Sequence, residues 1–119
     1  VICLGAAFKP NSDDVRDSPA LNVAAALQLQ GAQVRVTDPE AIDNARKLFP
    51  TLTYVESVEE AMVGADAVVL LTEWAQFRSL DPVAMKSLVR RPTIVDTRNA
   101  LDPTYWRGAG WTYRSVGRP

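Results

Sequence analysis

Short apolar runs alternate with longer stretches of mixed polarity along the chain. "VICL" at residues 1–4 is a continuous apolar run that ends at Gly5, and "DAVVLLT" at residues 66–72 is the strongest such run. Uninterrupted runs of this length are typical of strands that are buried on both faces, as in a parallel sheet. Weaker runs predict further strands at "QVRVTD", "TYVE", "TIVD" and "TYRSV".

The segments between these runs carry helix signals. Ser18 followed by Pro19 matches an N-cap residue and a first helical position, and Gly31 stands where a left-handed C-terminal residue is expected. The apolar side of this helix is expected to comprise Ala20, Leu21, Val23, Ala24, Leu27 and Leu29.

Further helices are predicted at residues 39–49, 57–65, 81–89 and 101–110, whereas "EWAQFRSL" at residues 73–80 is expected to be a loop. Strands that alternate with helices at this spacing are typical of α/β folds with a parallel sheet. We therefore expect a Rossmann-like α/β fold, with a doubly wound, mostly parallel sheet and helices on both faces.

Composition limits the setting and the partners. The 119 residues, 47% hydrophobic and 23% charged, fit a single globular domain. A net charge of −1 provides no basic surplus for a nucleic acid or an anionic membrane, so neither partner is expected. The longest apolar runs are too short to span a bilayer, and no signal peptide is recognisable, so a cytoplasmic setting is expected. The abrupt apolar start favours one domain of a longer protein.

Cysteine and histidine usage excludes several kinds of chemistry. Cys3 is the one cysteine and the sequence has no histidine, so we expect neither a disulfide within the chain nor a metal site. Cys3 lies inside an apolar run and is expected to be a buried structural residue.

Three polar segments follow predicted strands, at residues 9–17, 72–77 and 96–99. In an open parallel sheet the ligand binds beyond the carboxyl ends of the strands, where these segments should meet. Lys9 and Arg98 could reach a phosphate or a carboxylate there. An alternative remains open for the first segment, namely a solvated turn whose charges pair with one another.

The dinucleotide fingerprint is missing from the first turn. Gly5 is followed by Ala6, Ala7 and Phe8 in place of G-x-G-x-x-G. Without these glycines, Asp38 after the second predicted strand is expected to be a turn or cap residue, not a ribose ligand.

Three longer motifs carry a resemblance to a known family. "GAAFKPNSDDVRDSPAL", "VLLTEWAQFRSLD" and "VDTRNALD" resemble, in order, signatures of the C-terminal domain of the UDP-glucose and GDP-mannose dehydrogenase family. The resemblance covers the whole chain, residues 1–119, and implies the UDP-binding domain of a longer dehydrogenase. "TEW" suits the UDP-glucose branch better than relatives that act on N-acetylated sugars.

The resemblance also implies a reaction. Enzymes of this family oxidise C6 of a nucleotide sugar to a carboxylate with NAD, through a thioester on a cysteine in a "GFGG-x-C" type motif. That motif is not in this sequence, so the resemblance implies no catalytic residue within residues 1–119. UDP-N-acetyl-mannosamine and GDP-mannose are alternative substrates, and a non-catalytic nucleotide-binding module is a rival of another class.

Site residues follow from the resemblance position by position. Phe8, through its backbone, and Lys9, through its charge, are expected to contact the nucleotide sugar. Arg98 is expected near the same substrate, and Asn99 could share its role. An ion pair from Arg98 to Asp96 or Asp102 is the structural alternative.

The resemblance also implies that the segment at residues 9–17 contacts a second ligand, NAD. Arg16 is expected to reach NAD bound by an N-terminal domain, with Asp13 and Asp14 orienting the loop cations. The remaining domains of the same chain are therefore expected partners. The full-length protein is expected to be a homo-oligomer and this domain alone a monomer.

The aromatic residues are expected to pack. Trp74 and Phe77 are expected to lie under the loop, and Trp106 and Trp111 in the core or at an interface.

Overall fold

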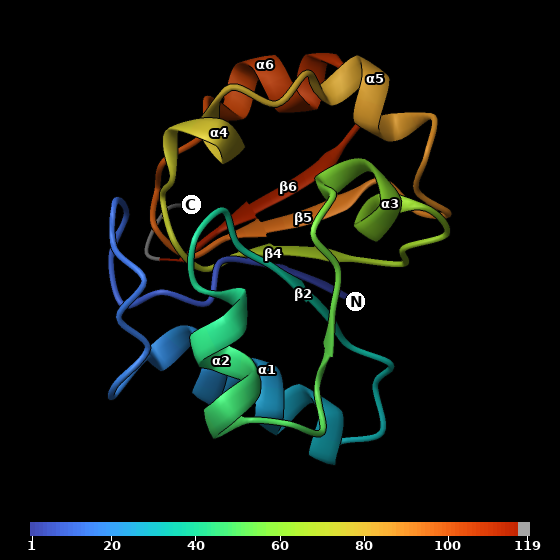
Figure 1. The fold of residues 1–119 in the computed structure, drawn as a ribbon. Coiled ribbons are helices and arrows are strands. Elements are labelled where there is room, and N and C mark those ends of the chain that lie inside the picture. The colour runs from blue at the N-terminus through green and yellow to red at the C-terminus, as the bar shows by residue number, and fades with distance from the viewer. Residues whose placement is uncertain (117–119) are drawn as a thin grey trace.

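Six parallel strands form one sheet in the computed structural model, which describes residues 1–116 (Figure 1). The strands are β1 (Ile2–Leu4), β2 (Arg35–Thr37), β3 (Thr53–Tyr54), β4 (Val68–Leu70), β5 (Thr93–Asp96) and β6 (Thr112–Ser115). Their order is β3-β2-β1-β4-β5-β6, and every pairing is parallel. The predicted parallel sheet is thus confirmed, with β1 at the point where the chain order reverses.

Helices cover both faces of the sheet, as predicted. They are α1 (Pro19–Leu29), α2 (Ile42–Leu48), α3 (Val58–Met62), α4 (Ala75–Arg78), α5 (Pro82–Lys86) and α6 (Pro103–Gly108). In Figure 1, α1 and α2 lie on one face of the sheet and the other helices on the opposite face. No helix within residues 1–116 combines the length and the apolar character that a membrane crossing requires.

The expectation of a plain loop at residues 73–80 is wrong, because α4 lies there. This single helical turn buries Phe77 beside the buried Trp74, as expected for these two aromatic residues. Four residues are too few to show a helical period in the sequence, which is why the pattern did not indicate the turn.

Helix α1 begins as predicted, but its buried side is narrower than expected. The Ser18 hydroxyl accepts a hydrogen bond from the Leu21 N–H (3.4 Å), and Gly31 has a φ of +96°. Val23 and Leu29, expected on the buried side, are 39% and 88% exposed. Because nearly every residue of α1 is apolar, the sequence could not show which of them face the sheet.

The core is formed by the strands and by two tryptophans. The four inner strands, β1, β2, β4 and β5, supply fully buried residues, among them Ile2, Leu4, Val36, Val68, Leu70 and Ile94. Trp106 and Trp111 are buried and pack edge to face with ring centroids 5.0 Å apart, which confirms them as core residues. Cys3 is buried as expected, and burial raises the pKa of its thiol to about 12.

A buried carboxylate, that of Asp38, terminates β2 at the edge where the strands end. Its Oδ2 accepts hydrogen bonds from the backbone N–H groups of Ala6 (2.8 Å) and Ala7 (3.0 Å) and from the Trp74 indole N–H (3.1 Å). Its Oδ1 accepts from the N–H groups of Glu40 and Ala41. One side chain therefore joins the segments that follow β1, β2 and β4.

Asp96 has a similar position at the end of β5 and is also fully buried. Its Oδ1 accepts from the Arg98 N–H (3.0 Å), and its Oδ2 accepts from the N–H groups of Ala100 and Leu101 and from the Tyr113 hydroxyl (2.7 Å). The loop that follows β5 is therefore fixed to the sheet.

We predict that Asp38→Asn lowers the free energy of unfolding by about 2–4 kcal/mol, because an amide has one oxygen for five donors and places its own N–H₂ against them. Urea denaturation of the 119-residue chain, followed by circular dichroism, would measure this. Asp43→Asn is the control, because the Asp43 side chain is 93% exposed, and its effect should be below about 0.5 kcal/mol. Equal midpoints for both variants would show that Asp38 does not hold the loops.

Candidate functional site

The carboxyl ends of the strands meet at one edge of the sheet, and the chain order reverses there between β1 and β4. Such a switch point is where open α/β sheets bind ligands. A hollow of about 550 Å³ opens at this edge, and its lining residues follow β1, β2 and β4: Asn11, Ser12, Asp13, Glu40, Trp74 and Gln76. The predicted site residues lie on loops at the same edge.

The turn that follows β1 is packed tightly against the segment that follows β4. Gly5 has a φ of +115°, and a Cβ there would lie 2.7 Å from the Thr72 backbone nitrogen. The Thr72 hydroxyl also donates a hydrogen bond to the Ala7 carbonyl (2.9 Å). Glycine is therefore required at position 5 for this close approach.

This turn does not fit a dinucleotide cofactor. In dinucleotide-binding folds, backbone N–H groups after β1 face the pyrophosphate, and an acidic residue after β2 binds a ribose. Here the N–H groups of Ala6 and Ala7 donate to Asp38, whose two oxygens already accept five hydrogen bonds. The turn role expected for Asp38 is confirmed, and NAD has no place at this turn of the chain.

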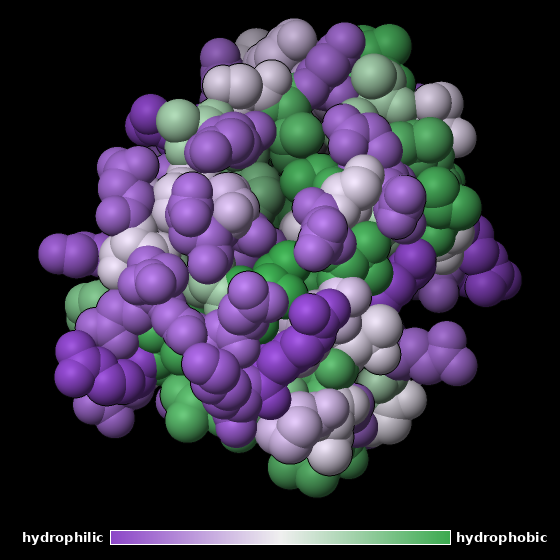
Figure 2. Space-filling view, viewed as in Figure 1, coloured by the Kyte–Doolittle hydropathy of each residue, from purple (hydrophilic) through white to green (hydrophobic). Residues whose placement is uncertain are grey.

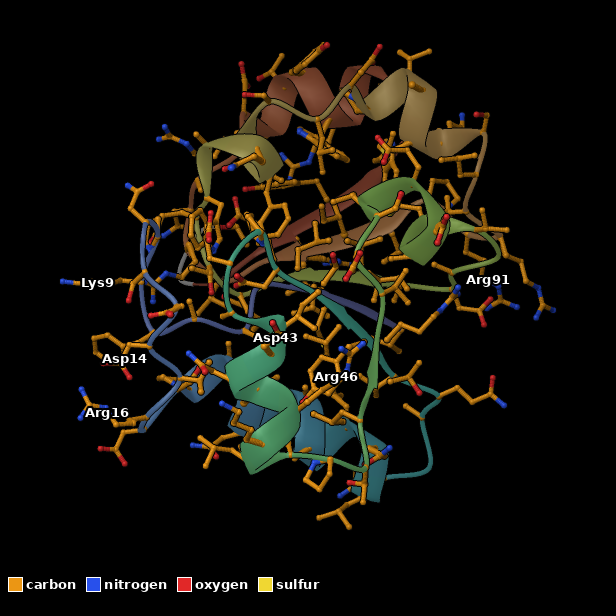
Figure 3. All side chains as sticks on the ribbon, viewed as in Figure 1. Lys9, Asp14, Arg16, Asp43, Arg46 and Arg91 are labelled. Atoms are coloured by element: carbon orange, nitrogen blue, oxygen red, sulfur yellow. The ribbon has the colours of Figure 1, made fainter. Side chains whose placement is uncertain are left out.

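Lys9 and Arg16 extend from the loop at residues 5–18 and point away from the body of the protein on the same side (Figure 3). Arg16 forms an ion pair with Asp14 (3.0 Å), and hydrogen bonds from Arg16 hold the pKa of Asp14 at about 2. This pair fits both the predicted orienting role of Asp14 and the alternative of a self-paired turn, so that role stays a prediction. The backbone carbonyl of Asp13 accepts a hydrogen bond from the Asn44 side chain (2.9 Å), which ties the loop to α2, and the orienting role of the Asp13 side chain also stays a prediction.

The ring of Phe8 is half exposed at the start of this loop. Its backbone N–H donates to the Asp14 carbonyl (2.9 Å), inside the loop itself. Because the Phe8 N–H is already used within the loop, the carbonyl oxygen is the backbone group of Phe8 that could contact a nucleotide sugar. That contact stays a prediction.

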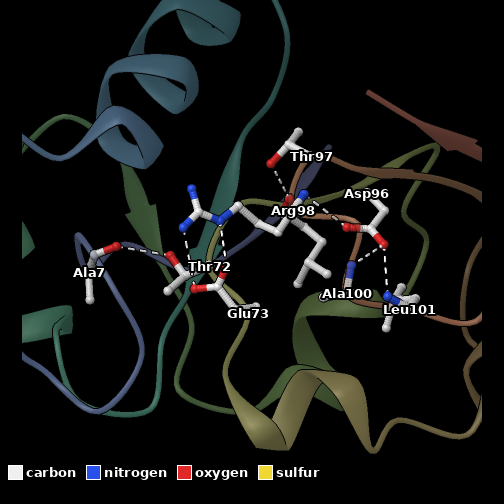
Figure 4. A network of polar contacts seen from close by, with 9 residues as sticks. Ala7, Thr72, Glu73, Asp96, Thr97, Arg98, Ala100 and Leu101 are labelled. Carbon is white, nitrogen blue, oxygen red and sulfur yellow. Dashed lines mark hydrogen bonds and ion pairs between the residues drawn. The ribbon is translucent and has the colours of Figure 1, made fainter. Parts of the chain in front are cut away.

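Arg98 has a partner that was not expected. Its Nε lies 2.6 Å from Oε2 of Glu73, in the segment that follows β4 (Figure 4). The structural alternative of an ion pair with Asp96 or Asp102 is wrong: Asp96 binds the Arg98 backbone and other donors, and Asp102 caps α6 through the Thr104 N–H. The hydrogen bond that Arg98 donates to the Glu73 carboxylate raises the pKa of the Arg98 guanidinium.

Left-handed backbone conformations cluster in the two candidate loops. Among residues 1–116, the non-glycine residues with positive φ are Asn11 (62°), Asp17 (53°) and Asn99 (54°). Asn99 also contacts the Ser115 hydroxyl through its side-chain oxygen. Such conformations are uncommon outside glycine and persist where the surrounding structure fixes them, often at functional sites.

Glu73 was not among the predicted site residues, although "TEW" follows the strongest predicted strand. A second hollow, of about 490 Å³, is lined by the predicted site residue Arg16 together with Lys47 and Leu48. A third hollow, of about 760 Å³, lies at the opposite edge beside Val1 and Asp66 and contains no predicted site residue.

The surface is uneven in polarity. In Figure 2, hydrophilic residues dominate the side on which the loop at residues 5–18 lies, whereas hydrophobic residues gather on the side of α3 and α5. The edge with the predicted site residues is therefore the more polar side of this face.

Comparison with known proteins identifies relatives of the whole chain. A UDP-glucose 6-dehydrogenase from Rhizobium meliloti (strain 1021) is 46% identical over 119 residues, which are 100% of this chain and 27% of the relative. Two solved structures agree in fold. An NDP-N-acetyl-D-galactosaminuronic acid dehydrogenase from Methanosarcina mazei Go1 has a TM-score of 0.86 and 31% identity, covering 98% of this chain and 24% of that one.

The second structure is a UDP-glucose dehydrogenase from the archaeon Pyrobaculum islandicum, with a TM-score of 0.75 and 36% identity over 95% of this chain and 24% of that one. The chain therefore spans about a quarter of the length of these relatives. The family described as "UDP-glucose/GDP-mannose dehydrogenase family, UDP binding domain" matches residues 2–103. The chain belongs to the UDP-glucose/GDP-mannose dehydrogenase family and corresponds to its UDP-binding domain.

Proposed function

We propose that residues 1–119 form the C-terminal, nucleotide-sugar-binding domain of a longer NAD-dependent UDP-glucose 6-dehydrogenase. The observation that carries the proposal is the placement of Lys9 and Arg98 at one edge of the sheet, on loops fixed by the buried carboxylates of Asp38 and Asp96. The similarity of the whole chain to a UDP-glucose 6-dehydrogenase supports the choice of sugar.

The diphosphate of the nucleotide sugar is the group that these cations would bind. Lys9 would act as a point charge, and Arg98 would donate in a fixed planar geometry. Asn99, held in a left-handed conformation next to Arg98, would place its amide near the same group. The Phe8 carbonyl oxygen can only accept a hydrogen bond, so it would contact a hydroxyl of the nucleotide sugar and not the diphosphate.

NAD would be bound mainly by another domain, because the turn that follows β1 has no place for it. When bound there, NAD would supply the hydride acceptor for the oxidation at C6 of the sugar. Arg16 points away from this domain, which suits a residue that reaches a cofactor bound on a neighbouring domain (Figure 3). Asp14 would hold the guanidinium in position through their ion pair.

The nucleophile would also come from outside this chain. The nucleophilic form of a cysteine is its thiolate, and burial raises the pKa of the Cys3 thiol to about 12, so Cys3 is protonated at neutral pH. This domain would therefore supply contacts to both ligands and no covalent chemistry.

Another nucleotide sugar is the second candidate for the substrate. The structure from Methanosarcina mazei, which has a TM-score of 0.86, is named for an N-acetylated sugar acid. The fold at this edge is therefore compatible with more than one sugar, and UDP-N-acetyl-mannosamine and GDP-mannose remain alternatives. A non-catalytic binding module would use the same edge without turnover.

We predict that the full-length protein produces NADH from NAD with UDP-glucose as substrate, which absorbance at 340 nm would measure. UDP-N-acetyl-mannosamine and GDP-mannose should give much lower kcat/KM values in the same assay. Turnover with one of these sugars but not with UDP-glucose would contradict the proposed substrate. Absence of turnover with all three would favour the non-catalytic module.

Lys9 and Arg16 lie on one loop but should affect different ligands. In the full-length enzyme, Lys9→Ala should raise the KM for UDP-glucose by about tenfold, because it removes a charge-assisted hydrogen bond. Arg16→Ala should instead raise the KM for NAD. Steady-state kinetics with each ligand varied in turn would separate the two effects.

Matched controls exist at other parts of the surface. Lys86→Ala removes an exposed lysine of α5. Arg90→Ala removes an arginine that forms an ion pair with Asp66 (3.6 Å) and directly precedes Arg91, which lies far from Lys9 in Figure 3. Neither control should change either KM. If Lys9→Ala and Arg16→Ala also leave both KM values unchanged, the loop is only a solvated, self-paired turn.

The 119-residue chain alone should bind UDP-glucose weakly and NAD not measurably, because the remaining contacts would come from other domains. Isothermal titration calorimetry with each ligand would measure both affinities. Micromolar or tighter binding of NAD by this chain would contradict the proposed division of roles between domains.

A further inference from the structure

The ion pair between Glu73 and Arg98 differs from the others in the described part of the chain. Four ion pairs occur within residues 1–116, and this one is the shortest, at 2.6 Å. Its side chains are also the best shielded, 28% exposed for Glu73 and 40% for Arg98. Exposed ion pairs contribute little, because water screens them and both side chains lose freedom, but shielding and short contacts strengthen the attraction.

Both partners stand on backbone that is already fixed. On one side of Glu73 the Thr72 hydroxyl donates to the Ala7 carbonyl, and on the other side the Trp74 indole donates to Asp38. The backbone N–H of Arg98 donates to Asp96, and the Thr97 hydroxyl donates to the Leu70 carbonyl (2.7 Å) (Figure 4). The pair therefore joins two rigid segments, which follow β4 and β5.

The contact leaves part of the guanidinium open. Glu73 accepts from Nε (2.6 Å) and from Nη2 (3.4 Å) of Arg98, so it occupies the side of the guanidinium nearest the chain. An arginine has five N–H donors, and three of them, on Nη1 and Nη2, remain for another acceptor. In Figure 4 the open nitrogen of Arg98 points away from Glu73.

We propose that Glu73 is a positioning residue, which holds the Arg98 guanidinium so that its outer nitrogens face the diphosphate of the nucleotide sugar. The inference rests on the proposed function for its substrate and adds a residue that acts through Arg98. Holding the guanidinium before the ligand arrives reduces the side-chain freedom that is lost on binding. The Glu73 carboxylate also lowers the local positive charge and so weakens the attraction of an anionic ligand. Attraction by charge alone therefore does not explain why Glu73 lies beside Arg98.

The test is a double-mutant cycle in the full-length enzyme, with Glu73→Ala, Arg98→Ala and the double variant. Glu73→Ala should raise the KM for UDP-glucose by about tenfold and leave kcat and the KM for NAD within about twofold, because a diphosphate contact is kept throughout the reaction. In the Arg98→Ala background, Glu73→Ala should change the KM by less than about twofold.

Two amide variants provide the matched comparison. Glu73→Gln keeps one accepting oxygen for Nε and should raise the KM less than Glu73→Ala does. Asp66→Asn removes the carboxylate of the exposed pair with Arg90 and should leave the KM unchanged. Because Gln is close in shape to Glu, this variant also keeps the proposal testable if Glu73→Ala does not fold.

Three kinetic results would overturn the inference. The first is an unchanged KM for UDP-glucose in Glu73→Ala and Glu73→Gln while Arg98→Ala raises it. The second is a Glu73→Ala variant in which the KM values for UDP-glucose and NAD rise equally. The third is a rise in the KM for UDP-glucose on Glu73→Ala that persists in the Arg98→Ala background. Calorimetric titration of the same proteins with UDP makes the same comparison without turnover. A wild-type protein that binds UDP but does not oxidise UDP-glucose would overturn the proposed function alone, and no UDP binding would overturn both.

Discussion

The Asp38 carboxylate is the contact on which the functional edge of this domain depends. It accepts five hydrogen bonds and joins the segments that follow β1, β2 and β4 in one buried cluster. Burying a carboxylate is costly unless its lone pairs are satisfied, and here the donors are mostly backbone N–H groups that would otherwise lack partners. The same hydrogen bonds close the turn that dinucleotide-binding folds use for their cofactor.

A second buried carboxylate, that of Asp96 at the end of β5, fixes the other loop of the candidate site. Asp96 holds the backbone of Arg98, as Asp38 holds the turn that leads to Lys9. The protein has a net charge of −1, so an anionic ligand must be bound by a few placed cations and not by a general positive field. In the proposed function, the two buried carboxylates fix the backbone that leads to Lys9 and that carries Arg98 before a ligand binds.

The sequence predicted the sheet better than the site. Apolar runs such as "DAVVLLT" indicate buried strands directly, whereas α4 and the outward direction of Val23 and Leu29 depend on packing that no short pattern contains. Charge counts left open whether the first loop binds a ligand, and only the resemblance singled out Arg16. The partner of Arg98, Glu73, is 25 positions away in the chain, so only the fold could reveal the pair.

The central claim is that a nucleoside diphosphate binds at the carboxyl ends of the strands. Titrating UDP into the ¹⁵N-labelled 119-residue chain and recording ¹H–¹⁵N NMR spectra would test it most directly, since weak binding still shifts amide resonances. The account predicts shifts confined to residues 7–17, 71–76 and 96–101. Shifts gathered instead around the hollow beside Val1 and Asp66, at the opposite edge of the sheet, would contradict it.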